Sequence, residues 1–320
     1  MGRDRSTDSR AKMAYTKLIP RFTSNAQVEE ISQENRLKAY RLSIPAGASD
    51  KYRLAQLDDY AKTARSRFPL RHPIQLRLSA RASSEAIPGT WGFGLWNDPF
   101  GLSLGFGGNP FRLPTLPNAV WFFGASKESY LSFRAERSDD GTSRSTVEAH
   151  DKYASRASTA SGATNAPLSA QRGVAANGFL AQTFRSPKFH PLLIPAGLAL
   201  PFSRTMTRQL MGKVIQEDGI RLSMDVTQWH RYQLDWRENQ VSFAIDDTQI
   251  FESRVSPHPP LGLVIWIDNQ YAAFTPDGKI GFGVLANPEP AWLEVKDIHV
   301  GRDGVPPITS VANNERSTLP

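Results

Sequence analysis

The sequence predicts an all-β protein that folds as a two-sheet antiparallel β-sandwich of the jelly-roll type. Ten short segments read as strands, and two of them show clear alternation between opposite faces. Gly and Pro contribute 23 residues each to a chain of 320, which supplies many turns. Turn pairs such as Pro-Gly, Asp-Gly and Asn-Pro stand between the apolar segments. Short strands at this spacing are typical of a sandwich of two antiparallel sheets.

The clearest strand is residues 74–82, in which aliphatic residues alternate with Gln, Arg and Ser. Residues 91–96 place Trp91, Phe93 and Leu95 on one face, and Gly92, Gly94 and Trp96 on the other. Further strands are expected at residues 120–125, 130–135, 178–186, 229–236, 241–245, 261–268, 279–285 and 291–300.

One helix is expected near residues 203–216. Ser203 can cap its first turn, and Met206, Leu210 and Val214 recur at helical spacing. Basic residues lie on the opposite face of this helix.

Composition divides the chain into four parts. Residues 1–40 are polar and predict a flexible N-terminal arm, and residues 302–320 predict a flexible tail. The sandwich domain is expected at 41–301. Within it, residues 137–177 are rich in Ser, Ala, Thr and Gly, and predict a disordered low-complexity insertion.

Charge and apolar content exclude several classes of protein. The net charge of +7 is spread along the chain without long basic runs, so no nucleic-acid partner is expected. The longest apolar stretch, 191–202, is too short for a transmembrane segment and contains three prolines. The N-terminus lacks the apolar core of a signal peptide, so a cytoplasmic location is expected. Cysteine is absent.

Two short matches to catalytic motifs lack the required context. Residues 101–105 fit Gly-x-Ser-x-Gly, but the Gly- and Pro-containing sequence after them cannot open a helix. Residues 281–286 approximate a dinucleotide-binding loop, but Asn-Pro-Glu-Pro follows it. The six histidines are scattered, with no pair at ligand spacing. No metal and no cofactor are therefore expected.

Three motifs occur in a characteristic order. They are PGTWGFGLWND at 88–98, WHRYQLDW at 229–236 followed by VSFAIDD at 241–247, and PLGLVIW at 260–266. Their order resembles the concanavalin A-like lectin/glucanase superfamily and, within it, the laminarinase-type family 16 glycoside hydrolases. The resemblance covers residues 74–300 without the insertion. It implies a concanavalin A-like jelly roll, and places Trp229 and Trp236 in the core.

The chain departs from this family at the catalytic motif. The resemblance implies a strand of the form Glu-x-Asp-x-Glu, whose carboxylates share one face at about 6.6 Å spacing, as a retaining mechanism needs. The matching stretch here is NAVWFFG at 118–124, which contains no carboxylate. No two of the 31 acidic residues in the chain are spaced i, i+2. No catalytic residue is therefore assigned.

Aromatic residues stand where the resemblance would place the active site. By strand parity, Trp96 and Asp98 share one face of their strand, Trp266 and Asp268 share one face of theirs, and Trp121 falls where the family has its nucleophile. Exposed tryptophans beside glycines form a groove in which a sugar ring can stack. The expected ligand-binding residues are Trp96, Asn97, Asp98, Trp121, Trp266, Asp268, Asn269 and Gln270.

Three functions remain open at this point. The first is a non-catalytic sandwich that binds a carbohydrate or similar ligand on its concave aromatic face. The second is a structural or interaction protein without a small ligand, in which the basic helix near 204–216 contacts a partner or an anionic membrane surface. The third is a glycoside hydrolase with displaced carboxylates, for which Asp98, Asp268 and Glu136 are the candidates.

Overall fold

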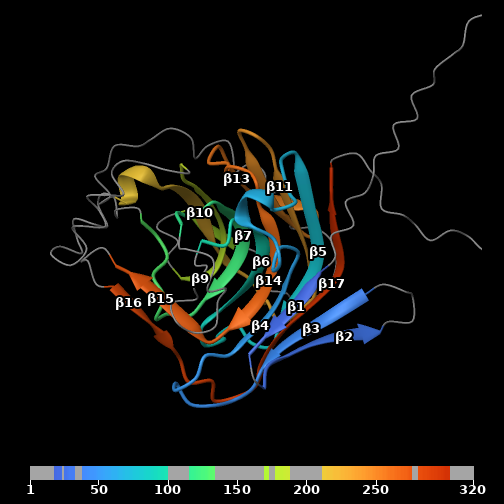
Figure 1. Cartoon of the computed structure of the whole chain (residues 1–320), viewed down its shortest axis with the longest axis vertical. Helices are drawn as coiled ribbons and strands as arrows, with labels where there is room; N and C mark the ends of the chain where they lie inside the picture. Colours follow the sequence, from blue (N-terminus) through green and yellow to red (C-terminus); the bar gives the residue numbers. More distant parts are fainter. Residues whose placement is uncertain are drawn as a thin grey trace, which may run out of the picture.

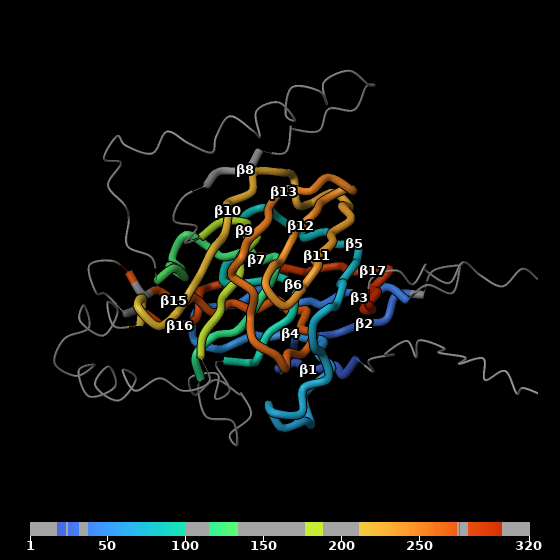
Figure 2. The backbone as a smooth tube through the Cα atoms, turned by 90° about the horizontal axis from the view of Figure 1, so that it is seen from above, coloured from blue at the N-terminus to red at the C-terminus, as the bar shows by residue number. Residues whose placement is uncertain are grey.

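Two antiparallel sheets pack face to face, which confirms the predicted jelly-roll sandwich (Figure 1). The structure is a computed structural model, and it describes residues 18–23, 25–32, 38–99, 115–133, 169–172, 177–187, 211–275 and 280–302. Figure 2 shows the same two layers from above, with β11 and β12 in one layer and β7 and β9 in the other.

The larger sheet has eight strands among the described residues. In spatial order they are β1 (Ile19–Phe22), β4 (Leu54–Asp58), β14 (Gly262–Asp268), β6 (Thr90–Trp96), β7 (Ala119–Ala125), β9 (Gly178–Arg185), β10 (Gln216–Ser223) and β8 (Ser169–Arg172). The smaller sheet has seven described strands: β13 (Thr248–Ser253), β12 (Val241–Ile245), β11 (His230–Trp236), β5 (Ile74–Ala82), β17 (Ala291–Gly301), β3 (Lys38–Ile44) and β2 (Gln27–Ser32). A separate hairpin joins β15 (Gln270–Phe274) and β16 (Ile280–Val284).

The core between the sheets is built by strand alternation. Phe93 of β6 and Phe122 of β7 point inward and meet Tyr232 of β11, with ring centroids 4.9 and 5.0 Å apart. Phe243 of β12 packs edge-on against Phe122 at 5.2 Å. The apolar face of β5 contributes Leu76 and other buried aliphatic residues to the same cluster. The alternation predicted for residues 74–82 and 91–96 therefore matches the two faces of β5 and β6 in the structure.

Several sequence-based expectations need correction. The predicted N-terminal arm at residues 1–40 contains β1, β2 and the start of β3; β1 pairs with β4, β2 with β3, and β3 with β17. Within the predicted insertion at 137–177, β8 pairs with β10 and forms the edge of the larger sheet. In both cases, neighbouring strands supply backbone hydrogen bonds to segments whose own apolar content is low.

Two further elements differ from the prediction. Tyr130 makes only an isolated bridge to Ala273, and residues 131–133 are not in a strand. The expected helix at 203–216 is helical at 211–214 but ends there, because Gln216 already begins β10. Residues 134–135 and 203–210 lie outside the described residues, as does the Gly-x-Ser-x-Gly match at 101–105.

Trp229 was expected in the core together with Trp236, and this is wrong for Trp229. Trp236 is fully buried, and its indole N–H donates to the carbonyl of Pro257 at 3.2 Å. Trp229 is half-buried on the opposite side, where the Lys296 ammonium lies 4.4 Å and the Arg81 guanidinium carbon 5.0 Å from its ring centroid. The two tryptophans are seven positions apart, and an odd separation along a strand reverses the face.

The described residues include no helix with the length and apolar character needed to cross a lipid bilayer.

The two tryptophans should therefore differ in their contribution to stability. We expect Trp236→Ala to lower the free energy of unfolding by about 3–5 kcal/mol, as for other buried aromatic residues. Trp229→Ala should cost only about 1 kcal/mol, since it removes cation–π contacts at a partly exposed ring. Urea unfolding of both variants measures the difference, and equal losses would contradict the assignment of Trp229 to the outer face.

Candidate functional site

Three tryptophans meet on the outer face of the eight-stranded sheet, the face that points away from the seven-stranded sheet. Trp96, Trp121 and Trp266 come from β6, β7 and β14, which are adjacent strands. The rings of Trp96 and Trp266 are parallel within 6°, with centroids 5.9 Å apart. Trp121 lies 6.0 Å from Trp96 and 5.8 Å from Trp266, tilted against both. The structure thus brings together the three rings that the sequence singled out.

Glycines in β6 allow the rings to lie against the sheet. A Cβ at Gly94 would be 2.5 Å from the Cβ of Trp121, and a Cβ at Gly92 would be 3.1 Å from the ring of Trp266. Because both positions lack a side chain, the indoles occupy that space themselves. The glycines were expected to leave a groove between exposed tryptophans, but here they make room for the tryptophan rings.

The tryptophans form a second core and not an open groove. Trp121 is 5% exposed and Trp266 is 6% exposed, while Trp96 is half-buried. Every residue of β7 and of β14 is buried, which requires that both faces of these strands are covered. Side chains from other segments pack into the same cluster, namely Tyr52, Phe68, Leu116, Leu131, Phe133, Met211, Val214 and Ile215.

The indole N–H groups are also satisfied inside the protein. The Nε1 of Trp96 donates to Tyr60 Oη at 2.5 Å, and the Nε1 of Trp266 donates to Thr90 Oγ1 at 3.0 Å. The Nε1 of Trp121 lies 3.5 Å from Gln182 Oε1. Buried tryptophans normally find such partners.

The side chains of the two predicted asparagines, Asn97 and Asn269, form hydrogen bonds with backbone groups. Asn97 donates to the carbonyl of Leu116 at 2.9 Å and accepts from the N–H of Asn118 at 2.9 Å. Asn269 accepts from the N–H of Arg53 and donates to the carbonyls of Lys51 and Leu285. Both side chains are buried, so their amide groups connect loops and do not present hydrogen-bonding groups to a ligand.

Asp268 is held in a closed hydrogen-bond network. Its carboxylate accepts from the N–H and hydroxyl of Thr90, from the N–H of Gln270 and from the hydroxyl of Tyr52, at 2.7–3.2 Å. Burial of the carboxylate nevertheless dominates and raises the pKa of Asp268 to about 6. Gln270, which follows it, is half-exposed.

Asp98 and Asp268 lie at opposite ends of the sheet. Asp268 pairs with Thr90 at the start of β6, whereas Asp98 follows Trp96 at the end of the same strand. Six residue steps along a strand span about 20 Å. Asp98 itself adopts a φ of 50° and is buried, and its carbonyl accepts a hydrogen bond from Arg65. Glu136, the third candidate carboxylate, is outside the described residues.

Two acids that the sequence reasoning missed lie at the end of β4, where Asp58 is fully buried and Asp59 is half-buried. Asp58 accepts hydrogen bonds from Gln56 and from the N–H groups of Tyr60 and Ala61, and Arg21 approaches it at 3.6 Å. Asp59 accepts one bond from the N–H of Leu263, while its Oδ2 is buried without a partner. Burial raises the pKa of Asp59 to about 7. Within the described part of the chain, no three acidic or histidine side chains cluster as a metal site.

Comparisons with known proteins give fold similarity only. No protein-family model and no curated protein matches the chain. A family 16 endo-glucanase from Bacteroides ovatus is similar in structure with a TM-score of 0.38 and 9% identity, over 89% of this chain and 95% of that one. LamAcat from Zobellia galactanivorans gives a TM-score of 0.36 and 14% identity, over 86% and 90%. The binding domain of botulinum neurotoxin DC, in a complex with SialylT, gives 0.37 and 6%, over 90% and 43%. At these levels the matches indicate no activity or ligand for this chain.

Truncation of Trp266 tests whether the cluster is a core. We expect Trp266→Ala to lower the free energy of unfolding by about 3–5 kcal/mol, similar to Trp236→Ala, because it opens a cavity between Trp96 and Trp121. Urea unfolding measures the loss. A loss as small as that of Trp229→Ala would mean that Trp266 contributes little packing.

The buried carboxylate of Asp59 should make stability depend on pH. Its folded-state pKa of about 7 lies above the ordinary aspartate value of 3.8, so its favourable contribution is complete below pH 4 and is lost as the pH rises through 7. Asp59→Asn should therefore be more stable than the parent protein at pH 8, by on the order of 1–2 kcal/mol, and this advantage should shrink towards pH 5.

Thermal unfolding at several pH values measures this effect. The exposed Glu85→Gln is the control and should show no such trend. An advantage of Asp59→Asn that stays constant from pH 5 to pH 8 would contradict the assignment.

Proposed function

We propose that this protein is a non-hydrolytic β-sandwich that acts by binding. The observation that carries the proposal is the outer face of β7, which presents Ala119, Trp121, Phe123 and Ala125. General acid–base and nucleophilic catalysis of glycoside cleavage require ionisable groups at the scissile bond, and these four side chains have none.

The carboxylates of Asp58 and Asp268, which lie elsewhere on this face, do not replace the missing catalytic pair. Asp58 and Asp268 both lie on the outer face, on the neighbouring strands β4 and β14, but their positions differ by four residues in register. That offset corresponds to about 13 Å along the strands, beyond the roughly 5–9.5 Å that glycosidase carboxylate pairs span. Asp98 and Asp268 are separated further still. The hypothesis of displaced carboxylates is therefore the least supported of the three.

Carbohydrate is the ligand class that we propose first, with Trp96 as its contact. Of the three clustered tryptophans, Trp96 alone is half-exposed, and its ring is stacked on Trp266 and held through Tyr60. A fixed indole edge offers an apolar surface to a sugar ring at little entropic cost. Of the eight residues expected from the sequence, only Trp96 and Gln270 are not buried, and Gln270 lies beyond Asp268 at the other end of the strands.

The alternative is an interaction protein without a small ligand. The outer face of the seven-stranded sheet supports it, because Trp229 and Trp292 alternate there with Arg41, Arg81 and Lys296. Glu294 pairs with both arginines on this face, at 2.5 and 2.7 Å. These three basic side chains contact Glu294, the tryptophan rings or both. Such contacts are consistent with stabilisation of the sheet as well as with a protein interface.

Assays with β-glucans distinguish hydrolysis from binding without hydrolysis. We expect purified protein to release no reducing ends from laminarin or lichenan, since the outer face of β7 carries no ionisable side chain. Release of reducing ends above a heat-denatured control would contradict the non-hydrolytic proposal.

Binding is tested by affinity electrophoresis in gels that contain the same glucans. If Trp96 makes the contact, Trp96→Ala should lose the retardation that the parent protein shows. Trp292→Ala, which truncates a half-exposed tryptophan on the other sheet, should keep it. If Trp292→Ala loses the retardation and Trp96→Ala keeps it, the binding site lies on the seven-stranded sheet. A lack of retardation of the parent protein would favour the interaction protein.

A further inference from the structure

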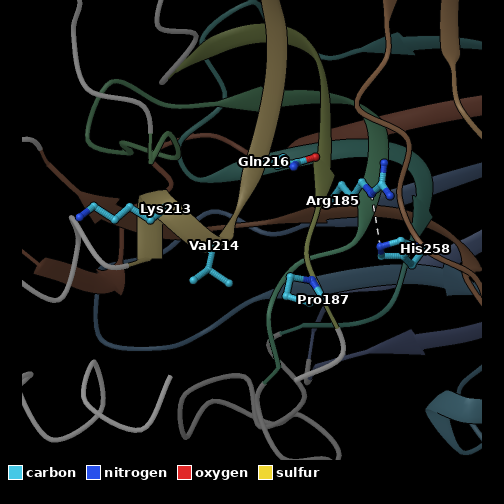
Figure 3. Close-up of a pocket in the computed structure, with 6 residues that line it drawn as sticks. All are labelled: Arg185, Pro187, Lys213, Val214, Gln216 and His258. Carbon is cyan, nitrogen blue, oxygen red and sulfur yellow. Dashed lines mark hydrogen bonds between the residues drawn. The ribbon is translucent and has the colours of Figure 1, made fainter. Parts of the chain in front are cut away.

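A basic cavity opens where β9 ends and β10 begins. It has a volume of about 290 Å³ and is lined by Arg185, Pro187, Lys213, Val214, Gln216 and His258 (Figure 3). Three of these six side chains carry or can accept a positive charge. None of the six is acidic.

Arg185 has an unusual partner for a guanidinium. It is half-buried at the last position of β9, and its Nε donates to Nε2 of His258 at 3.3 Å. This bond requires that Nε2 of the imidazole carries no proton, so the hydrogen bond contributes no countercharge. Among the described residues, no carboxylate pairs with Arg185. A partly buried cation without a countercharge is stabilised when an anion binds beside it.

The positions of Arg185 and His258 are fixed by a buried asparagine. Asn118 Oδ1 accepts from the N–H of Ser186 at 3.1 Å and from the N–H of His258 at 2.9 Å. Its Nδ2 donates to the carbonyl of Ser186 at 2.9 Å. One side chain thus ties the residue after Arg185 to the loop that carries His258. The two basic groups are therefore preorganised before any ligand arrives, which lowers the entropic cost of binding.

Gln216 and Lys213 complete the lining. Gln216 is the cross-strand partner of Arg185 in the β9–β10 ladder, so its amide lies on the same side of the sheet. Lys213 is exposed, and in Figure 3 its side chain extends away from the Arg185–His258 pair. It therefore adds positive charge at the rim and not a direct contact.

We propose that this cavity binds an oxyanion, namely phosphate, sulfate or a carboxylate group of similar size. The Arg185 fork matches two oxygens of such a group, and the Gln216 amide offers a further donor from the neighbouring strand. The volume lies at the lower limit of ligand pockets, which suits a free ion or one charged group of a larger molecule. The inference does not depend on the proposed function, since it concerns the end of the sandwich and not Trp96.

Titration with simple anions tests this proposal. The full chain is titrated with inorganic phosphate, inorganic sulfate and glucuronate, each at constant ionic strength adjusted with sodium chloride, and binding is followed by calorimetry and by the NMR signals of the His258 ring. We expect saturable binding of at least one anion and a shift of the His258 signals. Binding of the inorganic ions alone identifies a free ion, and binding of glucuronate as well identifies an acidic sugar.

Matched variants locate the site. Arg185→Gln should weaken binding about tenfold, the loss expected for one charge-assisted hydrogen bond. Lys213→Gln should weaken it only roughly two- to fivefold, because its charge is solvated. Arg77→Gln and Lys127→Gln remove exposed charges elsewhere and should leave binding unchanged. If Arg185→Gln does not fold, Arg185→Lys replaces it and should lose part of the affinity, because the fork is gone but the charge remains.

Either of two results would overturn the proposal. One is an absence of saturable binding of all three anions together with unmoved His258 signals. The other is a loss of affinity in Arg77→Gln as large as that in Arg185→Gln, which would show that net charge and not this cavity attracts the anion.

Discussion

The packing of Trp266 and Trp121 against Gly92 and Gly94 of β6 is the contact on which the outer face of the eight-stranded sheet depends. The outer face of β7 is apolar along its whole length, and that of β14 is apolar up to Asp268; such faces must be removed from water. Gly92 and Gly94 leave the space in which the indoles lie flat, and segments 131–133 and 211–215 close over them. The sandwich therefore has two cores, one between its sheets and one on the outside.

This second core determines what the face can do chemically. A carboxylate placed there loses hydration, as the raised pKa of Asp268 shows, even though four donors surround it. Hydrolysis would need two such groups close together, and the aromatic packing occupies the positions that would hold them. The binding sites that we propose lie at the margins of this core, at the exposed side of Trp96, and in the basic cavity at the end of β9.

Polar residues near the aromatic cluster mostly have structural tasks. Asn97, Asn118 and Asn269 each bond to backbone groups of segments that are distant in sequence. Their side chains replace the hydrogen bonds that loops lack, which is the usual role of buried amides. Asn97 and Asn269 stand close to Trp96 and Trp266 in the sequence, which suggested that they contact a ligand. Until its hydrogen-bond partners are known, an amide beside an aromatic residue is equally consistent with a ligand contact and with a structural role.

The sequence by itself determined the fold class, the course of most central strands and the face on which each residue of β5, β6 and β7 lies, because strand periodicity is a local property of the backbone. It also contained the parity that separates Trp229 from Trp236 and the unbroken apolar runs of β7 and β14, which indicate strands covered on both sides. Only the tertiary structure decided that β1 to β3 join the sandwich, that the tryptophan face is filled, and that Arg185 meets His258. These outcomes depend on which distant segments supply hydrogen bonds and apolar cover, and no local pattern encodes such pairing.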